Sequence, residues 1–315
     1  CEIGGTVGDI ESLPFLEAIR QFHNDNGHEN SLFIHVTLVP YIASSGELKT
    51  KPTQHSVKTL LEAGIQPDIL VCRTEYSLSK DLRKKIAQFC NVDFNSVIES
   101  IDASSIYEVP LLMAKEGLDK VVLNKLNLKI NKDVKLDKWK KFLNTLNNPS
   151  KEIKIGIVGK YVELQDAYKS ISEAIIHAGT KNSCRVIVNW IHAEKINKKN
   201  VEKKLATLNG IIVAPGFGDR GIEGKIHAIK YVRENNIPFL GICLGMQTAV
   251  IEYARNVLNL KDANSLEMNE KTPHPVIHLM ETQKNIFNKG GTMRLGSYEC
   301  SIMKNSKSFS AYKEE

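Results

Sequence analysis

A cysteine and the two glycines around it are the residues with the clearest chemical potential. Gly241 and Gly245 stand two residues before and two residues after Cys243, directly behind a short apolar run that predicts a buried strand. Glycines at this spacing permit the sharp strand-to-helix turn that presents a nucleophile at the top of a sheet. The amides and the dipole of the helix N-terminus favour the thiolate, which attacks carbonyl groups. The pattern predicts a nucleophile at Cys243, and a buried structural cysteine is the alternative.

A glycine turn from Ala214 to Gly221 is the second candidate element of this site, because it follows another predicted strand. A backbone amide near Gly216 can stabilise the oxyanion that forms when Cys243 attacks an amide. A glycine turn with no catalytic role is the alternative. The stretch from Gly156 to Lys160 lacks the spacing of a phosphate loop and predicts only a strand end.

The first half of the chain carries a different kind of candidate site. Its opening glycine-rich loop contains three carboxylates, Glu2, Asp9 and Glu11. Carboxylates in a glycine-rich loop suit a hard cation or donor groups better than a bare turn does.

Two lysines form the other candidate site of this half. Lys49 and Lys51 follow a stretch over 33–39 that predicts a buried strand, and open α/β sheets bind ligands at the ends of strands. The two cations suit a polyphosphate, and a solvated loop is the alternative.

Alternating strands and helices must position these residues. In the first half, strands are expected over 33–39, 68–72 and 96–100, and helices over 13–22, 56–63 and 82–90. In the second half, strands are expected over 153–158, 185–191, 211–214 and 236–241, and helices over 167–179, 222–234 and 248–258. This alternation predicts a doubly wound, parallel α/β sheet in each half. The buried face of the last helix is predicted at Met246, Ala249, Val250, Tyr253 and Val257.

Composition and length bound the protein class. The 315 residues, 42% hydrophobic and 25% charged, suffice for two globular domains. We expect domains at 1–130 and 153–315, joined by a Lys/Asn-rich linker at 131–152 in which Trp139 and Phe142 anchor a helix. The net charge of +6 is spread along the chain, which argues against a nucleic-acid partner.

Cysteine usage and hydropathy indicate in which cellular compartment the protein is expected. Six scattered cysteines without a C-x-x-C pair argue against a disulfide framework or zinc site and favour the reducing cytoplasm. No apolar run is long enough to span a bilayer, so no membrane partner is expected. The chain begins at Cys1 within an apolar-then-glycine pattern, and we expect that its N-terminus is missing.

Several stretches, in consistent order, resemble CTP synthases over essentially the whole length. In the first half these are residues 2–12, 49–55, 90–92 and 105–107, and in the second half 241–247 and 290–296. The resemblance implies a P-loop-like amidoligase (synthetase) domain followed by a class I glutamine amidotransferase domain. It also implies that ATP phosphorylates the 4-oxygen of UTP and that ammonia from glutamine displaces the phosphate. Mg²⁺, feedback inhibition by CTP, allosteric activation by GTP and a homotetramer are implied as well.

Residue roles follow from the same resemblance by motif position. The glutaminase nucleophile would be Cys243 and the oxyanion-hole residue Gly216. Glutamine contacts would be Leu244, Gly245, Met246, Gln247 and Glu267. UTP or CTP contacts would be Asp9, Ile10, Glu11, Lys49, Thr50, Lys51, Pro52, Thr53, Gln54 and Lys85. Ile101, Asp102 and Ala103 would lie by the adenine of ATP, Glu2 would bind Mg²⁺, and residues 217–224 would form a lid that responds to GTP.

The sequence departs from the family pattern in two respects. It reads Ala214-Pro215-Gly216 where the family reads Pro-Gly-Gly, and it lacks the family's phosphate loop, second metal-binding Asp, and triad His and Glu. His274 and His278 do not match the missing histidine. We therefore expect the chain as given to be incomplete for catalysis. A different class I amidotransferase and a non-catalytic scaffold or regulatory homologue are the alternatives; residues 49–55 argue against the former.

Overall fold

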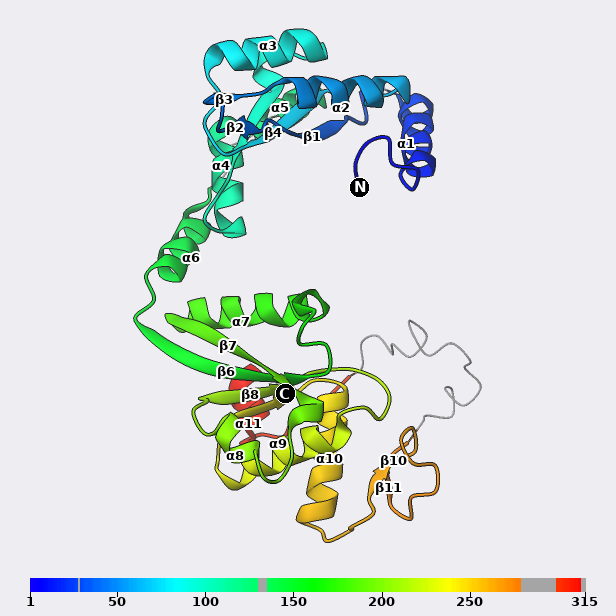
Figure 1. The fold of residues 1–315 in the computed structure, drawn as a ribbon, viewed down its shortest axis with the longest axis vertical. Helices are drawn as coiled ribbons and strands as arrows, with labels where there is room; N and C mark the ends of the chain where they lie inside the picture. Colours follow the sequence, from blue (N-terminus) through cyan, green and yellow to red (C-terminus); the bar gives the residue numbers. More distant parts are fainter. Residues whose placement is uncertain (28, 130–134, 279–298, 313–315) are drawn as a thin grey trace. The chain divides into compact units, whose positions relative to one another are not determined.

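The structure is a computed structural model that describes residues 1–27, 29–129, 135–278 and 299–312. The chain divides into two units, Cys1–Asn147 and Asn148–Glu315. The division falls inside the predicted linker. Figure 1 shows the elements of each unit. Within the described ranges, no helix has both the length and the apolar character needed to cross a membrane.

The first unit is built on three parallel strands in the order β1-β4-β5. These are β1 (Ile34–Leu38), β4 (Ile69–Thr74) and β5 (Val97–Ile101). Its helices are α1 (Leu13–Asn26), α2 (Lys51–Glu62), α3 (Lys80–Cys90), α4 (Val109–Glu116), α5 (Leu118–Lys125) and α6 (Asp137–Asn147). A hairpin of β2 (Tyr41–Ile42) and β3 (Glu47–Leu48) follows β1, and short 3₁₀ turns lie at Phe94–Ser96 and Ile106–Glu108.

Helices cover both faces of this sheet, as the doubly wound prediction requires (Figure 1). Leu70 and Cys72 of β4 pack with residues of α2 and α3, including Val57 and Ile86. On the other face, Ile69, Val71 and Ile98 pack against apolar residues of α4 and α5. The sheet core is therefore buried between two helix layers, which leaves the strand ends to carry function.

Two expectations for this unit are wrong in detail. Helix α2 begins at Lys51 rather than at residue 56, because Pro52 suits a first helical turn. Strand β1 was predicted to be buried, but Val36 and Leu38 are 59% and 57% exposed. The polar His35 and Thr37 face inward instead. The hydroxyls of α2 provide their partners, since His35 Nε2 lies 2.8 Å from Ser56 Oγ and Thr53 Oγ1 lies 3.2 Å from Thr37 Oγ1.

The predicted anchors of the linker helix are confirmed. Trp139 and Phe142 lie on α6, where their ring centroids are 5.6 Å apart. The indole Nε1 of Trp139 donates to the Tyr107 carbonyl at 2.7 Å. These contacts attach α6 to the first unit.

The second unit is built on four parallel strands in the order β7-β6-β8-β9. These are β6 (Lys151–Gly159), β7 (Cys184–His192), β8 (Gly210–Val213) and β9 (Phe239–Gly241). Its helices are α7 (Lys169–Lys181), α8 (Val201–Leu205), α9 (Ile222–Glu234), α10 (Leu244–Asn256) and α11 (Lys307–Tyr312). Short 3₁₀ turns lie at Gln165–Tyr168 and Ala193–Lys195, and β10 (Asn264–Ser265) pairs with β11 (Pro275–Ile277).

The buried face of α10 differs from the prediction. Met246, Val250 and Tyr253 are 50%, 39% and 49% exposed, and of the predicted face only Ala249 packs against the core. Leu244 and Ile251 are buried instead, in a cluster with two isoleucines of α9. The helix begins four residues earlier than expected, and its first turn is seated between β8 and α9.

Candidate functional sites

The strand-to-helix turn predicted around Cys243 is present in the second unit. Strand β9 ends at Gly241, α10 begins at Leu244, and Cys243 between them has φ 52° and ψ −109°. Such a backbone conformation is costly for a residue with a side chain and persists where the surroundings enforce it. The thiol is exposed. A strained backbone that presents a thiol at the end of a strand is the geometry of a nucleophile elbow.

Close backbone approach explains the two glycines of the elbow. A Cβ atom on Gly245 would lie 2.1 Å from the Val213 carbonyl oxygen, and one on Gly241 would lie 2.6 Å from the Gly245 backbone. The Ile242 amide donates to Val213 O at 3.0 Å, and the Gly245 amide donates to Ile242 O at 2.8 Å. The turn is thus pressed against the end of β8, and only glycine fits at either position.

The glycine turn after β8 lies beside this elbow. A Cβ on Gly216 would lie 3.6 Å from Cδ2 of Leu244, the residue that follows the cysteine. The Gly218 amide donates to the Glu267 carboxylate at 3.2 Å. The structure therefore places Gly216 beside Leu244, the neighbour of Cys243 in the chain, and joins Glu267 to the same glycine turn. Gln247 is half-buried in the first turn of α10, where its backbone N–H donates to Cys243 O at 3.0 Å, whereas the Met246 side chain is exposed.

Two buried lysines hold this turn, and the sequence analysis missed both. Lys160, 3% exposed, follows β6 and donates its Nζ to the carbonyl oxygens of Phe217 and Gly218. Lys225, fully buried on α9, donates its Nζ to Ala214 O at 2.7 Å. The signal was present for Lys225, because it lies on the same helical face as buried Ile222, Ile226 and Ile229.

Burial perturbs both ammonium groups. The pKa of Lys225 is lowered from 10.5 to about 8, mainly by burial and also by the positive charge of Lys160, whereas Cys243 acts in the opposite sense. Burial also lowers the pKa of Lys160, with Arg220 adding to the effect. Perturbed buried cations beside an exposed thiol are typical of a functional site.

The predicted nucleotide-binding lysines of the first unit also converge. The ammonium of Lys49 hydrogen-bonds to the Glu47 carboxylate, and this contact lowers the pKa of Glu47, with a further contribution from Lys85 on α3. Lys51 Nζ lies 5.7 Å from the centroid of Phe89, one turn along α3 from Lys85. Lysines from the start of α2 and from α3 thus share one exposed surface, which we call the lysine cluster: Lys49, Lys51 and Lys85.

The other predicted UTP-binding residues are placed differently. Thr53 is fully buried, and its hydroxyl donates to Leu38 O at 3.1 Å. Thr50 is 4% exposed, and its hydroxyl accepts from the Gln54 amide at 3.1 Å. These hydroxyls orient α2, whereas Pro52 is exposed in its first turn.

The N-terminal loop lies near the other end of α2. The Asp9 carboxylate accepts from the Thr6 amide at 3.0 Å, Ile10 is 79% exposed, and a Cβ on Gly8 would lie 3.2 Å from the Thr59 side chain. Thr59 stands eight residues after Lys51, about 12 Å along a helix axis. Glu2 and Glu11 are exposed. Within the described ranges, no group of three or more His, Cys, Asp or Glu side chains is placed to hold a metal.

The residues predicted to lie by adenine stand at the carboxyl edge of the sheet. Ile101 ends β5, the Asp102 amide donates to Thr74 O at 3.0 Å, and Ala103 follows. Asp102 also lies 3.5 Å from the Arg73 guanidinium. Parallel strands bind ligands at this edge.

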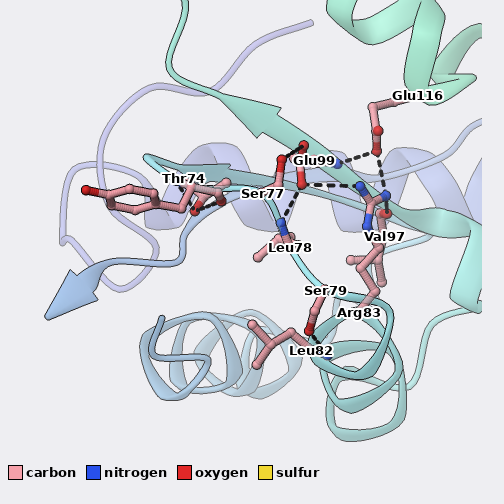
Figure 2. A network of polar contacts seen from close by, with 10 residues as sticks. Thr74, Ser77, Leu78, Ser79, Leu82, Arg83, Val97, Glu99 and Glu116 are labelled. Carbon is pink, nitrogen blue, oxygen red and sulfur yellow. Dashed lines mark hydrogen bonds and ion pairs between the residues drawn. The ribbon is translucent and has the colours of Figure 1, made fainter. Parts of the chain in front are cut away.

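Arg83 fixes helix α3, which carries Lys85 of the lysine cluster, to the sheet (Figure 2). Its guanidinium donates to Glu116 at 2.5 Å, to Glu99 at 3.3 Å and to Val97 O at 3.3 Å. Burial acts to raise the pKa of Glu116, but the hydrogen bonds from Arg83 and from the Glu99 amide outweigh it, so this pKa is lowered. Glu99 also accepts from the Leu78 amide at 2.5 Å. This network ties α3 and α4 to β5.

A polar pocket of about 480 Å³ lies elsewhere in the second unit. Residues of β7, α8 and the loop after β6 line it, among them Glu163, Asn189 and His192. None of the predicted site residues takes part in it.

Comparisons with known proteins match both halves of the chain. Residues 1–128 match the family described as CTP synthase N-terminus, and residues 163–314 match glutamine amidotransferase class-I. This second range includes residues 290–296, which lie outside the described residues.

Relatives named CTP synthase match the chain from end to end. The Flavobacterium johnsoniae protein is 63% identical over 314 residues, which is 100% of this chain and 58% of the relative. The Methanocaldococcus jannaschii protein is 60% identical over 317 residues, 99% of this chain and 58% of the relative. The chain thus spans 58% of the length of these relatives. The solved Trypanosoma brucei CTPS glutaminase domain with bound acivicin is 37% identical, with a TM-score of 0.40, over 42% of this chain and 52% of that one.

Proposed function

Because the chain belongs to the CTP synthase family, we propose that it takes part in forming CTP from UTP, with ATP and with ammonia released from glutamine. The observation that carries the proposal is the Cys243 elbow, whose strained backbone lies next to the glycine turn of Gly216, to which Glu267 is hydrogen-bonded at Gly218. A chain that had kept only the fold would have no need of a strained, exposed thiol at this position.

In the second unit, the Cys243 thiolate would attack the carboxamide carbon of glutamine. The C–N bond then breaks, ammonia leaves with a proton from an acid, and water hydrolyses the thioester to glutamate. The amide at Gly216 would stabilise the oxyanion. Glutamine would be held by Leu244, Gly245, Met246, Gln247 and Glu267. We assign the acid/base role to neither His274 nor His278, which flank β11.

In the first unit, the lysine cluster would bind the phosphates of UTP or of the inhibitor CTP, because point charges suit phosphate whichever base is attached. Asp9, Ile10 and Glu11, in the N-terminal loop near the other end of α2, would contact the remainder of the nucleotide. Thr50 and Thr53 would act through the position of α2, and Pro52 and Gln54 through its first turns. ATP would lie at the carboxyl edge, by Ile101, Asp102 and Ala103.

Mg²⁺ fits the exposed Glu2 as one protein ligand. This ion is usually held by one or two carboxylates together with substrate phosphates, rather than by a cage of protein groups. When bound, it would neutralise phosphate charge.

The proposal also covers allosteric regulation, oligomeric state and cellular compartment. Residues 217–224 would form a lid that responds to the activator GTP, and the protein would assemble as a homotetramer. Six free cysteines support a reducing compartment, the cytoplasm.

Replacement of the thiol tests the proposal. In a full-length protein of this family that carries this sequence, Cys243→Ala should abolish glutamine-dependent CTP formation and leave ammonia-dependent formation intact. The nucleophile is needed only to release ammonia. Cys300→Ala, which removes another exposed cysteine, is the matched control and should keep both activities. Loss of both activities in a folded Cys243→Ala protein would instead make Cys243 structural.

A further inference from the structure

The polar pocket of about 480 Å³ in the second unit is a separate candidate binding site. Its volume is that of a pocket for a small molecule. It lies along the carboxyl-terminal half of β7, the outer strand of the four-stranded sheet, and Lys204 of α8 also lines it. None of the residues assigned above to glutamine, to nucleotides, to Mg²⁺ or to the lid is among its lining residues.

Two polar atoms of this pocket are buried without a hydrogen-bond partner. Among the described residues, three side-chain nitrogen or oxygen atoms are in this situation. Two of the three, Asn189 Nδ2 and His192 Nδ1, belong to residues that line the pocket. Nearly all buried polar groups in folded proteins are paired, because an unpaired one carries the full cost of its desolvation. Two such atoms in one cavity indicate an occupant that supplies their partners.

The two atoms require partners of opposite kind. Asn189 Nδ2 is an amide donor, so its partner must be an acceptor oxygen. His192 Nε2 lies 2.9 Å from the Glu163 carboxylate, which accepts the ring proton. In the neutral ring, Nδ1 therefore presents a lone pair, and its partner must be a donor such as a hydroxyl. The occupant thus carries both an acceptor and a donor group.

The charge of the lining residues favours an anion as the acceptor. Lys195 and Lys204 both line the pocket, whereas Glu163 is the only acidic residue among those that line it and is bonded to His192. Lysine ammonium groups bind phosphate as point charges. Asn189 and His192 stand three residues apart on β7, which is about 10 Å along a strand. A bare phosphate is too short to serve both residues, but a phosphate ester with hydroxyl groups is long enough.

We propose that this pocket binds a small phosphate ester with free hydroxyl groups, of the sugar-phosphate class. The phosphate interacts with Lys195, Lys204 and the Asn189 amide, and a hydroxyl donates to His192 Nδ1. This inference goes beyond the proposed function and is independent of Cys243, so each can fail without the other.

Binding of ribose 5-phosphate to the 315-residue chain tests the inference. Trp190 lines the pocket, so its fluorescence in a Trp139→Phe background reports occupancy, and titration calorimetry measures the same affinity without the fluorophore. We expect saturable binding with a dissociation constant below about 1 mM. Ribose lacks the anion and inorganic phosphate lacks the hydroxyls, so each should bind at least about 10-fold more weakly. No saturable binding of ribose 5-phosphate by either method, or equal affinity for inorganic phosphate, would contradict the proposal.

Variants of the lining residues separate ligand binding from a structural role. Asn189→Leu removes the unpaired donor at similar volume. It should weaken ribose 5-phosphate binding about 5–10-fold and should not lower the free energy of unfolding of the second unit. Lys204→Met should weaken binding to a similar extent. Lys203→Met, on the same helix but outside the pocket, is the matched control and should leave the affinity unchanged.

The hydroxyl contact has its own test. His192→Phe should weaken binding of ribose 5-phosphate but not that of inorganic phosphate, because only the ester carries a hydroxyl for Nδ1. If Asn189→Leu destabilises the second unit and leaves the affinity unchanged, the Asn189 amide is structural and the inference is wrong. Equal losses of affinity in Lys203→Met and Lys204→Met would show that the anion binds the surface of α8 without using the pocket, and would overturn the inference as well.

Discussion

The two candidate sites differ in the structural feature on which each depends. In the second unit, the decisive feature is the backbone: a non-glycine residue with φ 52°, and glycines that lie against carbonyl oxygens. In the first unit, the decisive feature is side-chain charge, supplied by Lys49 just before α2 and by Lys85 on α3, which both act on Glu47. The first is a closely packed backbone that presents one exposed thiol. The second is an exposed cluster of cations, which we propose binds a large anion.

This contrast predicts opposite responses to substitution. A site that depends on backbone geometry should fail together with its fold, because the same contacts provide both. A site that depends on exposed charges should lose affinity by degrees, while stability hardly changes. The chain suits the comparison, since each unit contains one of its two tryptophans, Trp139 in the first and Trp190 in the second.

The largest effect is expected from Gly245→Ala. Alanine favours a helix interior by up to about 1 kcal/mol over glycine, but here its Cβ would lie 2.1 Å from Val213 O. We expect the second unit to lose about 3 kcal/mol or more of its free energy of unfolding. Urea unfolding followed by Trp190 fluorescence, in a Trp139→Phe background, measures this.

Gly4→Ala is the matched control, because nothing lies within 4 Å of the added Cβ. Trp139 fluorescence in a Trp190→Phe background should show a change below about 0.5 kcal/mol for this variant. A Gly245→Ala protein as stable as wild type would mean that the elbow is not pressed against β8.

Arg83→Met should have the next largest effect, and in the first unit only. It leaves Glu99 and Glu116 without their cation, and their side chains are only 12% and 19% exposed. We expect a loss of about 2–4 kcal/mol, measured by Trp139 fluorescence. Arg20→Met, which removes an exposed pair with Glu17 in the same unit, should cost less than about 1 kcal/mol.

The Arg83→Met variant should also change how the free energy of unfolding depends on pH. The folded state holds the pKa of Glu116 below its ordinary value of 4.5. The ionised carboxylate therefore contributes stability above about pH 4.5, and this contribution is lost as the pH falls through the lowered folded value. Arg83→Met should flatten this acid dependence. An unchanged acid profile would show that the network of Figure 2 does not act through ionised Glu116.

Sequence reasoning anticipated the local features of both units. The predicted range of α9, 222–234, is the observed one, and the glycine spacing predicted the turn at Cys243. These features depend on residues near one another in the chain. Alternation of strands and helices likewise predicted two parallel sheets, since short connections leave few other arrangements.

The faces of the elements were harder to predict. Periodicity shows which residues share a face, but both faces of β1 and of α10 present a regular pattern. Val36 and Val250 are apolar and exposed, whereas Thr37 and Thr248 are polar and buried. Their burial depends on partners far along the chain, such as Thr53 for Thr37. For Lys225, by contrast, the periodicity did carry a signal, because this lysine shares a helical face with the buried Ile222, Ile226 and Ile229.

The smallest effect is expected in the lysine cluster, where the contrast between the sites can be tested most finely. In a full-length protein of this family that carries this sequence, Lys49→Ala should weaken UTP and CTP binding alike by about 10-fold, because one charge-assisted contact to phosphate is lost. Glu47→Gln should strengthen binding, since the Glu47 carboxylate hydrogen-bonds to Lys49 and opposes the anion. Lys58→Ala, on the same helix α2 and exposed, is the matched control and should change neither affinity.

Titration calorimetry at two salt concentrations measures the UTP and CTP affinities of all three variants. The effect of Lys49→Ala should shrink at high salt through screening. Unchanged UTP affinity in Lys49→Ala, or equal losses in Lys49→Ala and Lys58→Ala, would remove the lysine cluster from the nucleotide site.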